Sequence, residues 1–122
     1  KSLRASPEGW ARVAINAYHQ FKADCIVAES NNGGEMVRLT LGTVDPNVPV
    51  KLVQASRGKQ IRAEPIAALY EQKKVWHTQS FLALEDQLCL WTPDSPSSPD
   101  RLDSLVWAMS ELMLGGRPQI WV

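Results

Sequence analysis

The chain has 122 residues, a length that fits one domain with a core of its own. Its 13 Lys and Arg residues balance 13 Asp and Glu residues, so any contact with nucleic acid must be local rather than driven by a general positive field. No apolar run approaches the roughly 20 residues that span a bilayer, and no signal peptide is recognisable. We therefore expect a protein of the cytoplasm.

Apolar and polar residues alternate in a way that predicts helices and short strands. The helix starts carry capping residues and prolines, and turn residues separate the elements. The predicted segments, in chain order, are a helix from Ser6 to about Lys22, a strand over 24–28 ending at Glu29, a turn at 31–34, a helix from Met36 to Asp45, a strand over 50–55, a basic loop over 56–60, a helix from Glu64, a short strand over 75–77, a short helix around 81–88, a loop over 92–99, and a helix from Asp100 that Gly115 and Gly116 end.

This order implies an α/β fold with a parallel sheet core. The strands over 24–28 and 50–55 are predicted to pair in parallel, with helices on both faces. Because only two or three strands are visible, we expect an exposed sheet edge that pairs with further strands or with another chain.

Cys25 and Cys89 lie in apolar segments without a Cys-x-x-Cys spacing. This pattern predicts buried, reduced thiols and argues against a disulfide framework or a zinc site. Five tryptophans spread along the chain are expected to fill the core rather than to stack on bases.

Three acidic residues stand where an α/β fold places its site. Glu29 ends the first predicted strand, and strand ends carry the sites of such folds. Asp100 and Asp103 are three residues apart at a helix start, so they share one helix face. Clustered carboxylates without His or Cys are ligands for Mg²⁺ or Mn²⁺, and two such ions support phosphodiester cleavage. The pattern predicts that Glu29, Asp100 and Asp103 form a catalytic metal site.

Each of these acids also has an ordinary explanation. Asp in the first turn of a helix, followed by Asp three residues on, is a common capping pattern. Glu29 can equally be a solvated carboxylate at a strand terminus. Spacing alone leaves both explanations open.

Arg57, Lys59 and Arg62 form the concentrated basic group of the sequence, in and just after a loop that contains Gly58. A glycine lets the backbone approach a ligand closely, so these side chains are predicted to contact DNA phosphates. The alternative is a solvated basic loop. No GxxxxGK[ST] run precedes a helix, so ATP hydrolysis is not predicted here.

Covalent catalysis has no support in the sequence. Neither cysteine has polar neighbours that would activate it, and no GxSxG elbow is present. His77 follows a predicted strand near the same sheet edge, but a lone histidine is more often structural, as is His19 on its helix.

Three ordered runs resemble the nuclease domain of phage terminase large subunits. They are residues 23–34 (ADCIVAESNNGG), residues 53–65 (VQASRGKQIRAEP) and residues 99–108 (PDRLDSLVWA), with Ser104 where the family usually has alanine. The resemblance extends from about Ser6 to Leu114, and three motifs in order are more specific than one carboxylate pair.

This resemblance implies a ribonuclease H-like three-layer fold, related to Holliday-junction resolvases, in which a two-metal carboxylate site cuts concatemeric viral DNA during packaging. Glu29 matches the second acidic ligand. Asp100 and Asp103 match the paired acids of the closing helix. Either of them could bind the metal directly, while the other supports that ligand without coordinating the metal itself. Lys59 and Arg62 would contact or orient DNA phosphates. The implied cofactor is Mg²⁺ or Mn²⁺.

The resemblance also implies the setting of the protein. Its partners would be double-stranded DNA, the terminase ATPase domain, and the small subunit or the portal. All of these lie in the cytoplasm of a bacterial host that carries the phage or prophage. No membrane partner is expected.

One departure from the family concerns the start of the chain. The family's first acidic ligand lies on an opening strand, followed by two further strands, before the helix that begins here at Ser6. We therefore expect residues 1–122 to form a single, partial nuclease domain, truncated at its N-terminus and of low activity in isolation. The alternatives are a non-catalytic DNA- or protein-binding module that self-associates through its strand edge, and a resolvase-like junction nuclease, which the first two runs argue against.

Overall fold

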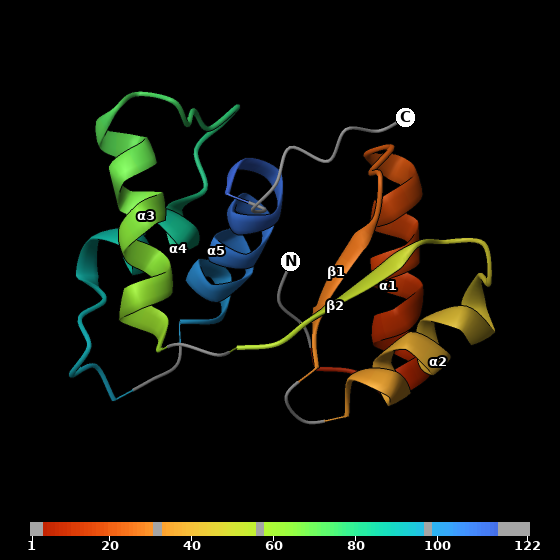
Figure 1. Cartoon of the computed structure of the whole chain (residues 1–122). Helices are drawn as coiled ribbons and strands as arrows, with labels where there is room; N and C mark the ends of the chain where they lie inside the picture. The colour runs from red at the N-terminus through yellow and green to blue at the C-terminus, as the bar shows by residue number, and fades with distance from the viewer. Residues whose placement is uncertain (1–3, 31–32, 56–57, 97–98, 115–122) are drawn as a thin grey trace. The chain divides into compact units, whose positions relative to one another are not determined.

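The computed structural model describes residues 4–30, 33–55, 58–96 and 99–114 (Figure 1). The chain divides into two compact units, Lys1–Ser56 and Arg57–Val122. The elements, in chain order, are α1 (Pro7–Gln20), β1 (Ile26–Glu29), α2 (Gly34–Val44), β2 (Val50–Val53), α3 (Lys59–Glu71), α4 (Leu82–Leu90) and α5 (Asp100–Met113). The mixed α/β class expected from the sequence is confirmed.

Helix α1 begins as its sequence predicts. The hydroxyl of Ser6 accepts the backbone N–H of Gly9 at 3.2 Å, Pro7 occupies the first turn, and Glu8 lies at the positive end of the helix dipole. Glu8 also forms an ion pair with Arg12 at 2.6 Å. The first expected helix is therefore confirmed.

Strands β1 and β2 pair in parallel, which confirms the expectation from the sequence. Ile26 lies opposite Val50, and Glu29 lies opposite Val53. The ladder continues through Ser30, whose N–H donates to the carbonyl of Val53 at 2.8 Å. β2 ends at Val53, two residues earlier than expected, and α2 connects the two strands as a β-α-β unit.

The core of the first unit lies on one face of the strand pair. Its buried residues come from α1, α2 and the segment before β2: Ala11, Ile15, Leu41 and Val48. Ile26 and Val50, which are register partners, pack against this cluster, so α1 and α2 cover the same face of the strands (Figure 1). A helical cover for the second face stays a prediction.

The turn between β1 and α2 depends on two glycines. Gly33 has a φ angle of 94°, a left-handed conformation that favours glycine. Gly34 is buried at the first position of α2, where an added Cβ atom would clash with the Cβ of Ser30. The chain therefore enters α2 by a close approach that a side chain would block.

A polar contact joins the C-terminal ends of α1 and α2. Nε2 of His19 lies 2.9 Å from the carboxylate of Asp45, which also accepts the N–H of Asn47 at 3.0 Å. The Asn47 N–H and the His19 side chain together hold the pKa of the Asp45 carboxyl below its usual range. His19 thus has the structural role expected from the sequence.

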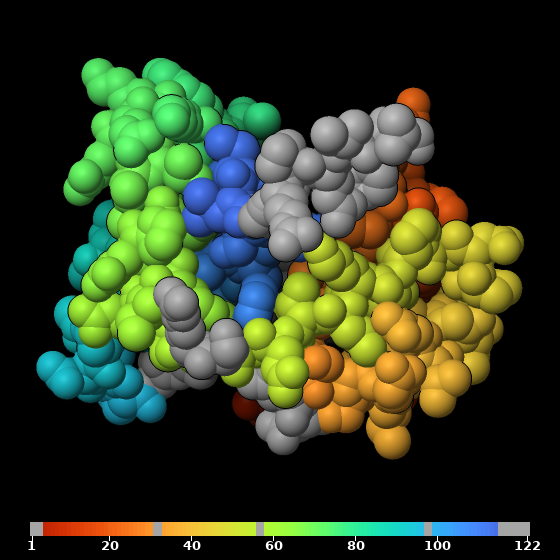
Figure 2. All heavy atoms as spheres, in the orientation of Figure 1, coloured from red at the N-terminus to blue at the C-terminus, as the bar shows by residue number. Residues whose placement is uncertain are grey.

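The second unit consists of three helices in its described residues. α3 and α4 both pack against α5, around a buried cluster of apolar side chains. The buried members are Ile66, Leu69, Leu102 and Val106. The side chains of α3 form a continuous surface over one face of this unit (Figure 2). None of the helices described for the chain has the length and apolar character needed to cross a membrane.

Helix α3 begins at Lys59, five residues before the start at Glu64 that the sequence predicts. The carbonyl of Gly58 accepts the N–H of Arg62 at 3.1 Å and opens the helix. Pro65 therefore lies inside the helix instead of at its first turn, where its missing N–H costs one helical hydrogen bond. The predicted loop was too long at its C-terminal end, because packing of α3 on α5 outweighs the local signal of the proline.

Residues 75–77 do not form the predicted strand. A strand needs a neighbour for its backbone groups, and no described segment supplies one.

His77 is held by side chains instead: its Nε2 lies 2.8 Å from the hydroxyl of Tyr70, and its Nδ1 lies 3.0 Å from the Glu85 carboxylate. Glu85 also accepts the N–H of Phe81, and the contacts with His77 and Phe81 lower its pKa. Burial, and then the Glu85 charge, raise the pKa of Tyr70.

The last two expected helices are confirmed as α4 and α5, and α5 begins at Asp100 as predicted. The predicted end of α5 at Gly115 and Gly116 lies outside the described residues.

Both cysteines are free thiols, as expected, but the prediction that they are buried is wrong. Cys25 is half-buried, and Cys89 is exposed because its neighbour Leu88 is the residue of α4 that packs, partly buried, against the apolar cluster.

Candidate metal centre and basic surface

The N-terminus of α5 is capped by a side chain from another helix. Oε1 of Gln87, on α4, accepts the backbone N–H groups of Arg101 at 3.0 Å and of Leu102 at 2.9 Å. The residue in the capping position of α5 is Pro99, which has no side-chain acceptor. Gln87 therefore satisfies two donors that a helix start leaves open.

This arrangement bears on the capping explanation for the two aspartates. A capping role for Asp100 and Asp103 was an open alternative from their spacing, but the N–H groups of Arg101 and Leu102 donate to Gln87 instead. Asp100 is exposed at the first position of α5. Both aspartates lie in the first turn of α5, near the positive end of the helix dipole.

Asp103 is paired with a cation. Its Oδ2 lies 2.8 Å from the ammonium nitrogen of Lys59, the first residue of α3, with 22% and 34% of the two side chains exposed. A lysine in the first turn of a helix meets an unfavourable dipole, so the Asp103 charge compensates for its position. The two aspartates are therefore different: Asp103 is committed to an ion pair, whereas Asp100 faces solvent.

Arg62 lies one turn after Lys59 on α3 and contacts the next turn of α5. Its guanidinium carbon is 4.7 Å from the centre of the Trp107 ring. Because Lys59 meets Asp103 and Arg62 meets Trp107, α3 and α5 run in the same direction with both N-termini at one end of the unit. Lys59 and Arg62 thus lie on a helix rather than in the solvated loop of the alternative explanation, and Arg57 lies outside the described residues.

Glu29 belongs to the first unit and ends β1. It is exposed, and the alternation of the strand places it on the face opposite to Ile26, away from the core of this unit. The structure thus confirms its place at the carboxyl end of a parallel strand. Convergence of Glu29 with Asp100 and Asp103 stays a prediction.

The chemistry of these donors suits a hard cation, but the set is not complete within one unit. Exposed carboxylates are the oxygen ligands that Mg²⁺ and Mn²⁺ prefer. Neither unit, in its described residues, brings together three His, Cys, Asp or Glu side chains able to hold a metal ion.

Comparison with protein families decides which kind of domain this is. A family model described as the terminase RNaseH-like domain matches residues 1–112. The chain belongs to this family. Comparisons with curated proteins and with solved structures gave no match. The family is one of metal-dependent nucleases, and membership implies DNA and other terminase components as partners in general.

Two residues of this terminase RNaseH-like domain contact the candidate site but were not singled out from the sequence. They are Gln87, which caps α5, and Trp107, which contacts Arg62. Nothing in the local pattern marks Gln87 as a cap, because it lies 14 residues before the N–H group of Arg101. Trp107 was assigned to the core with the other tryptophans. Its place one turn after Asp103 was the available signal that it shares a helix face with the acids.

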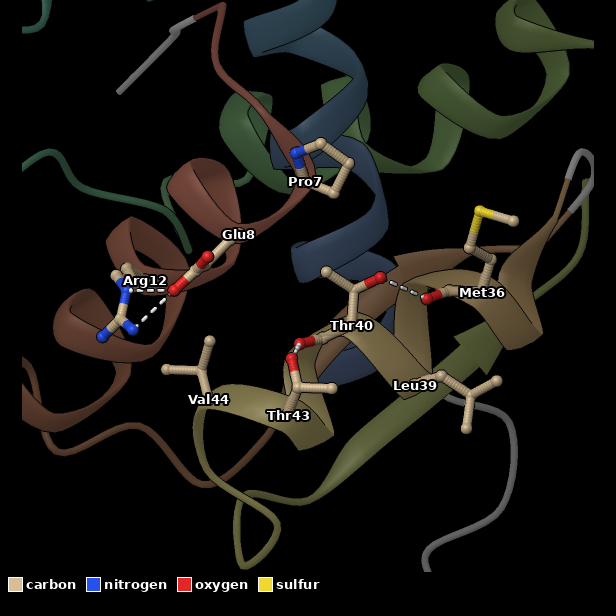
Figure 3. Close-up of a pocket in the computed structure, with 8 residues that line it drawn as sticks. All are labelled: Pro7, Glu8, Arg12, Met36, Leu39, Thr40, Thr43 and Val44. Carbon is tan, nitrogen blue, oxygen red and sulfur yellow. Dashed lines mark hydrogen bonds and ion pairs between the residues drawn. The ribbon is translucent and has the colours of Figure 1, made fainter.

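The first unit contains a groove that none of the candidate site residues lines (Figure 3). It runs between the start of α1 and the outer side of α2, where Met36 and Leu39 are 71% and 68% exposed. Its ionic group is the Glu8–Arg12 pair, and the hydroxyl of Thr40 donates to the carbonyl of Met36 at 2.7 Å. The lining residues are Pro7, Glu8, Arg12, Met36, Leu39, Thr40, Thr43 and Val44. The groove offers this terminase domain no cluster of catalytic groups.

Proposed function

We propose that the chain is the nuclease domain of a phage terminase large subunit and cuts concatemeric double-stranded DNA during genome packaging in the bacterial cytoplasm. The two units would together form one ribonuclease H-like, three-layer domain. The observation that carries the proposal is the start of α5: Gln87 caps the helix, so the exposed carboxylate of Asp100 is left for a ligand in a chain that belongs to a nuclease family.

The contacts of the three acids support different roles. Glu29 and Asp100 are exposed carboxylates, at a strand end and at a helix start, and we assign both as direct metal ligands. Asp103 shares its charge with Lys59, which weakens its attraction for a cation. We therefore assign Asp103 as a positioning residue that holds the first turns of α3 and α5 together behind Asp100.

Two divalent ions, Mg²⁺ or Mn²⁺, would supply an activated water and stabilise the leaving oxygen of the phosphodiester. The protein side chains hold the ions and orient the DNA. Lys59 and Arg62, at the same end of the unit as Asp100, would contact backbone phosphates, as would Arg57. The helix N-termini of α3 and α5 add positive potential at that end.

A second candidate function is a binding module without catalysis. Along β1, the backbone groups of successive residues point alternately toward β2 and away from it. The N–H and carbonyl of Val27 point away from β2 and form no bond with a described residue. Such an edge can accept a strand from a partner, or from a second copy of the chain. This function is favoured if Glu29 and Asp100 do not share a metal ion.

The test is cleavage of linear and supercoiled DNA by the full terminase subunit that contains this domain, with Mg²⁺ and with Mn²⁺. Glu29→Gln and Asp100→Asn should abolish cleavage, because each removes a charged ligand but little volume. Asp103→Asn should reduce it by only about 10- to 100-fold, the usual effect of a residue behind the ligand. Glu71→Gln, an exposed acid at the end of α3, is the matched control and should keep full activity.

Two results would overturn these assignments. Full cleavage by the Glu29→Gln variant would remove the nuclease site proposed here and favour the binding module. Equal losses in the Asp100→Asn and Asp103→Asn variants would contradict the separate roles of the two aspartates.

A further inference from the structure

Trp76 is an exposed aromatic residue that neither apolar core accounts for. The sequence predicts that the tryptophans fill the core, and Trp10 and Trp91 do pack against the buried clusters of their units. Trp76 is instead 79% exposed, so the prediction is wrong at this residue. An indole left in water forgoes a large gain from burial. A role for this ring therefore has to be sought outside the core.

The backbone on both sides of Trp76 is held in place. The residue lies in the segment that joins α3 to α4 (Figure 1). Val75, before it, packs against the apolar cluster of the second unit. His77, after it, is held by the Tyr70 hydroxyl at 2.8 Å and by the Glu85 carboxylate at 3.0 Å. The chain thus anchors both neighbours and presents Trp76 to solvent.

The indole ring is also fixed by its polar group. Its Nε1 donates to the carbonyl of Lys73 at 3.0 Å. Lys73 has a φ angle of 56° and ends the turn after α3, where its N–H donates to the carbonyl of Tyr70 at 3.0 Å. The single donor of the indole is thereby satisfied, and the exposed part of the ring is its aromatic surface. A ring fixed in this way has little freedom left to lose on binding.

Two exposed lysines belong to the same turn as the ring. Lys73 and Lys74 precede Trp76 by three and two residues, and Glu71 is the one acid of the sequence from 71 to 77. Because the indole N–H reaches the Lys73 carbonyl, the ring lies beside the backbone that carries both ammonium groups. The local charge is therefore positive beside an aromatic face.

An aromatic face next to cations is the arrangement that binds single-stranded nucleic acid. Bases stack on the ring, and ammonium groups contact the phosphates on either side. In a duplex each base is already stacked between its neighbours. A single exposed ring therefore favours unpaired bases over paired ones.

We propose that Trp76, Lys73 and Lys74 form a binding site for single-stranded DNA. One unpaired base stacks on the indole, and the two lysines contact the flanking phosphates. The ligand is DNA because membership of the family implies DNA as a partner. The site shares no residue with the proposed metal centre, so the inference goes beyond the proposed cleavage and does not depend on it.

The experiment measures binding of the 122-residue chain to a labelled thymidine oligonucleotide and to a labelled duplex, in EDTA and at several salt concentrations. Trp76→Leu keeps an apolar side chain without a π face and should weaken binding of the oligonucleotide about 5- to 150-fold. Duplex binding should not change. Trp76→Phe keeps an aromatic face and should retain most of the affinity. Lys73→Gln and Lys74→Gln should each reduce the slope of log affinity against log salt by about 0.7.

Phe21→Leu is the matched control. Phe21 follows α1, is 72% exposed and precedes Lys22, so it is a second exposed aromatic residue beside a lysine. This variant should bind the oligonucleotide as the parent chain does. Unchanged affinity in Trp76→Leu, or an equal loss in Phe21→Leu, would overturn the site. An equal loss of duplex binding in Trp76→Leu would overturn stacking of an unpaired base, and unchanged salt slopes in both lysine variants would overturn the phosphate contacts.

Discussion

Gly34 and Gly42 lie in the same helix but differ in what a methyl group would meet. At Gly34 an added Cβ would clash with the Cβ of Ser30, whereas at Gly42 no atom lies within 4 Å. Ser30 cannot move easily, because its N–H and its hydroxyl both donate to the carbonyl of Val53, at 2.8 and 3.1 Å. The space between Ser30 and Gly34 therefore leaves no room for a side chain at position 34.

Gly34→Ala should lower the free energy of unfolding by about 1–3 kcal/mol, the usual cost of overpacking. Gly42→Ala should raise it by about 0.5–1 kcal/mol, because alanine is the better helix former and has space there. Urea denaturation of the two variants measures both changes. A Gly34→Ala variant as stable as the parent would show that Gly34 and Ser30 do not approach each other as closely as described.

At the scale of elements, the start of α5 depends on α4 through one side chain. Gln87 accepts two N–H groups of α5, so the first turn of this helix is fixed by a residue outside it. The same turn carries Asp100. The cap therefore links the packing of two helices to the position of a proposed ligand.

Gln87→Ala should destabilise the chain by about 1–2 kcal/mol, the range observed for loss of a helix cap. Hydrogen exchange at the amides of Arg101 and Leu102 should accelerate more than exchange in α3, because their acceptor is lost. Gln87→Glu retains an acceptor and should keep both amides protected. Unchanged exchange at these two amides in Gln87→Ala would contradict the cap.

The sequence predicted the elements whose signals are local. Ser6 and Pro7 start α1, and the apolar runs around Ile26 and Leu52 form the expected parallel pair. The errors arose where contacts distant in sequence decide. α3 extends back to Lys59 because it packs on α5, and residues 75–77 are not a strand because no described strand pairs with them.

The candidate site divides in the same way. The place of Glu29 at a strand end and of Asp100 at a helix start followed from local pattern. The unequal contacts of Asp100 and Asp103 did not, because they depend on Lys59, which is 44 residues away from Asp103 in the sequence, and on Gln87. Charge pairs and caps between helices leave no periodic signal in the chain.

At the scale of the whole molecule, the proposed nuclease needs one metal centre built from both units. Glu29 comes from the first unit, and Asp100 comes from the second. If they bind the same ion, the metal also stabilises the association of the units, because binding to the assembled form draws the equilibrium toward it.

The most direct test is NMR of the ¹⁵N-labelled chain titrated with Mn²⁺, whose unpaired electrons broaden the signals of nearby amides. The account predicts that the amides of Ala28 and Ser30, beside Glu29, and those of Arg101 and Leu102, beside Asp100, broaden together at the same low Mn²⁺ concentration. Glu29→Gln should then abolish broadening in both groups. Broadening confined to one unit, or broadening at Arg101 and Leu102 that persists in the Glu29→Gln variant, would contradict a shared metal centre.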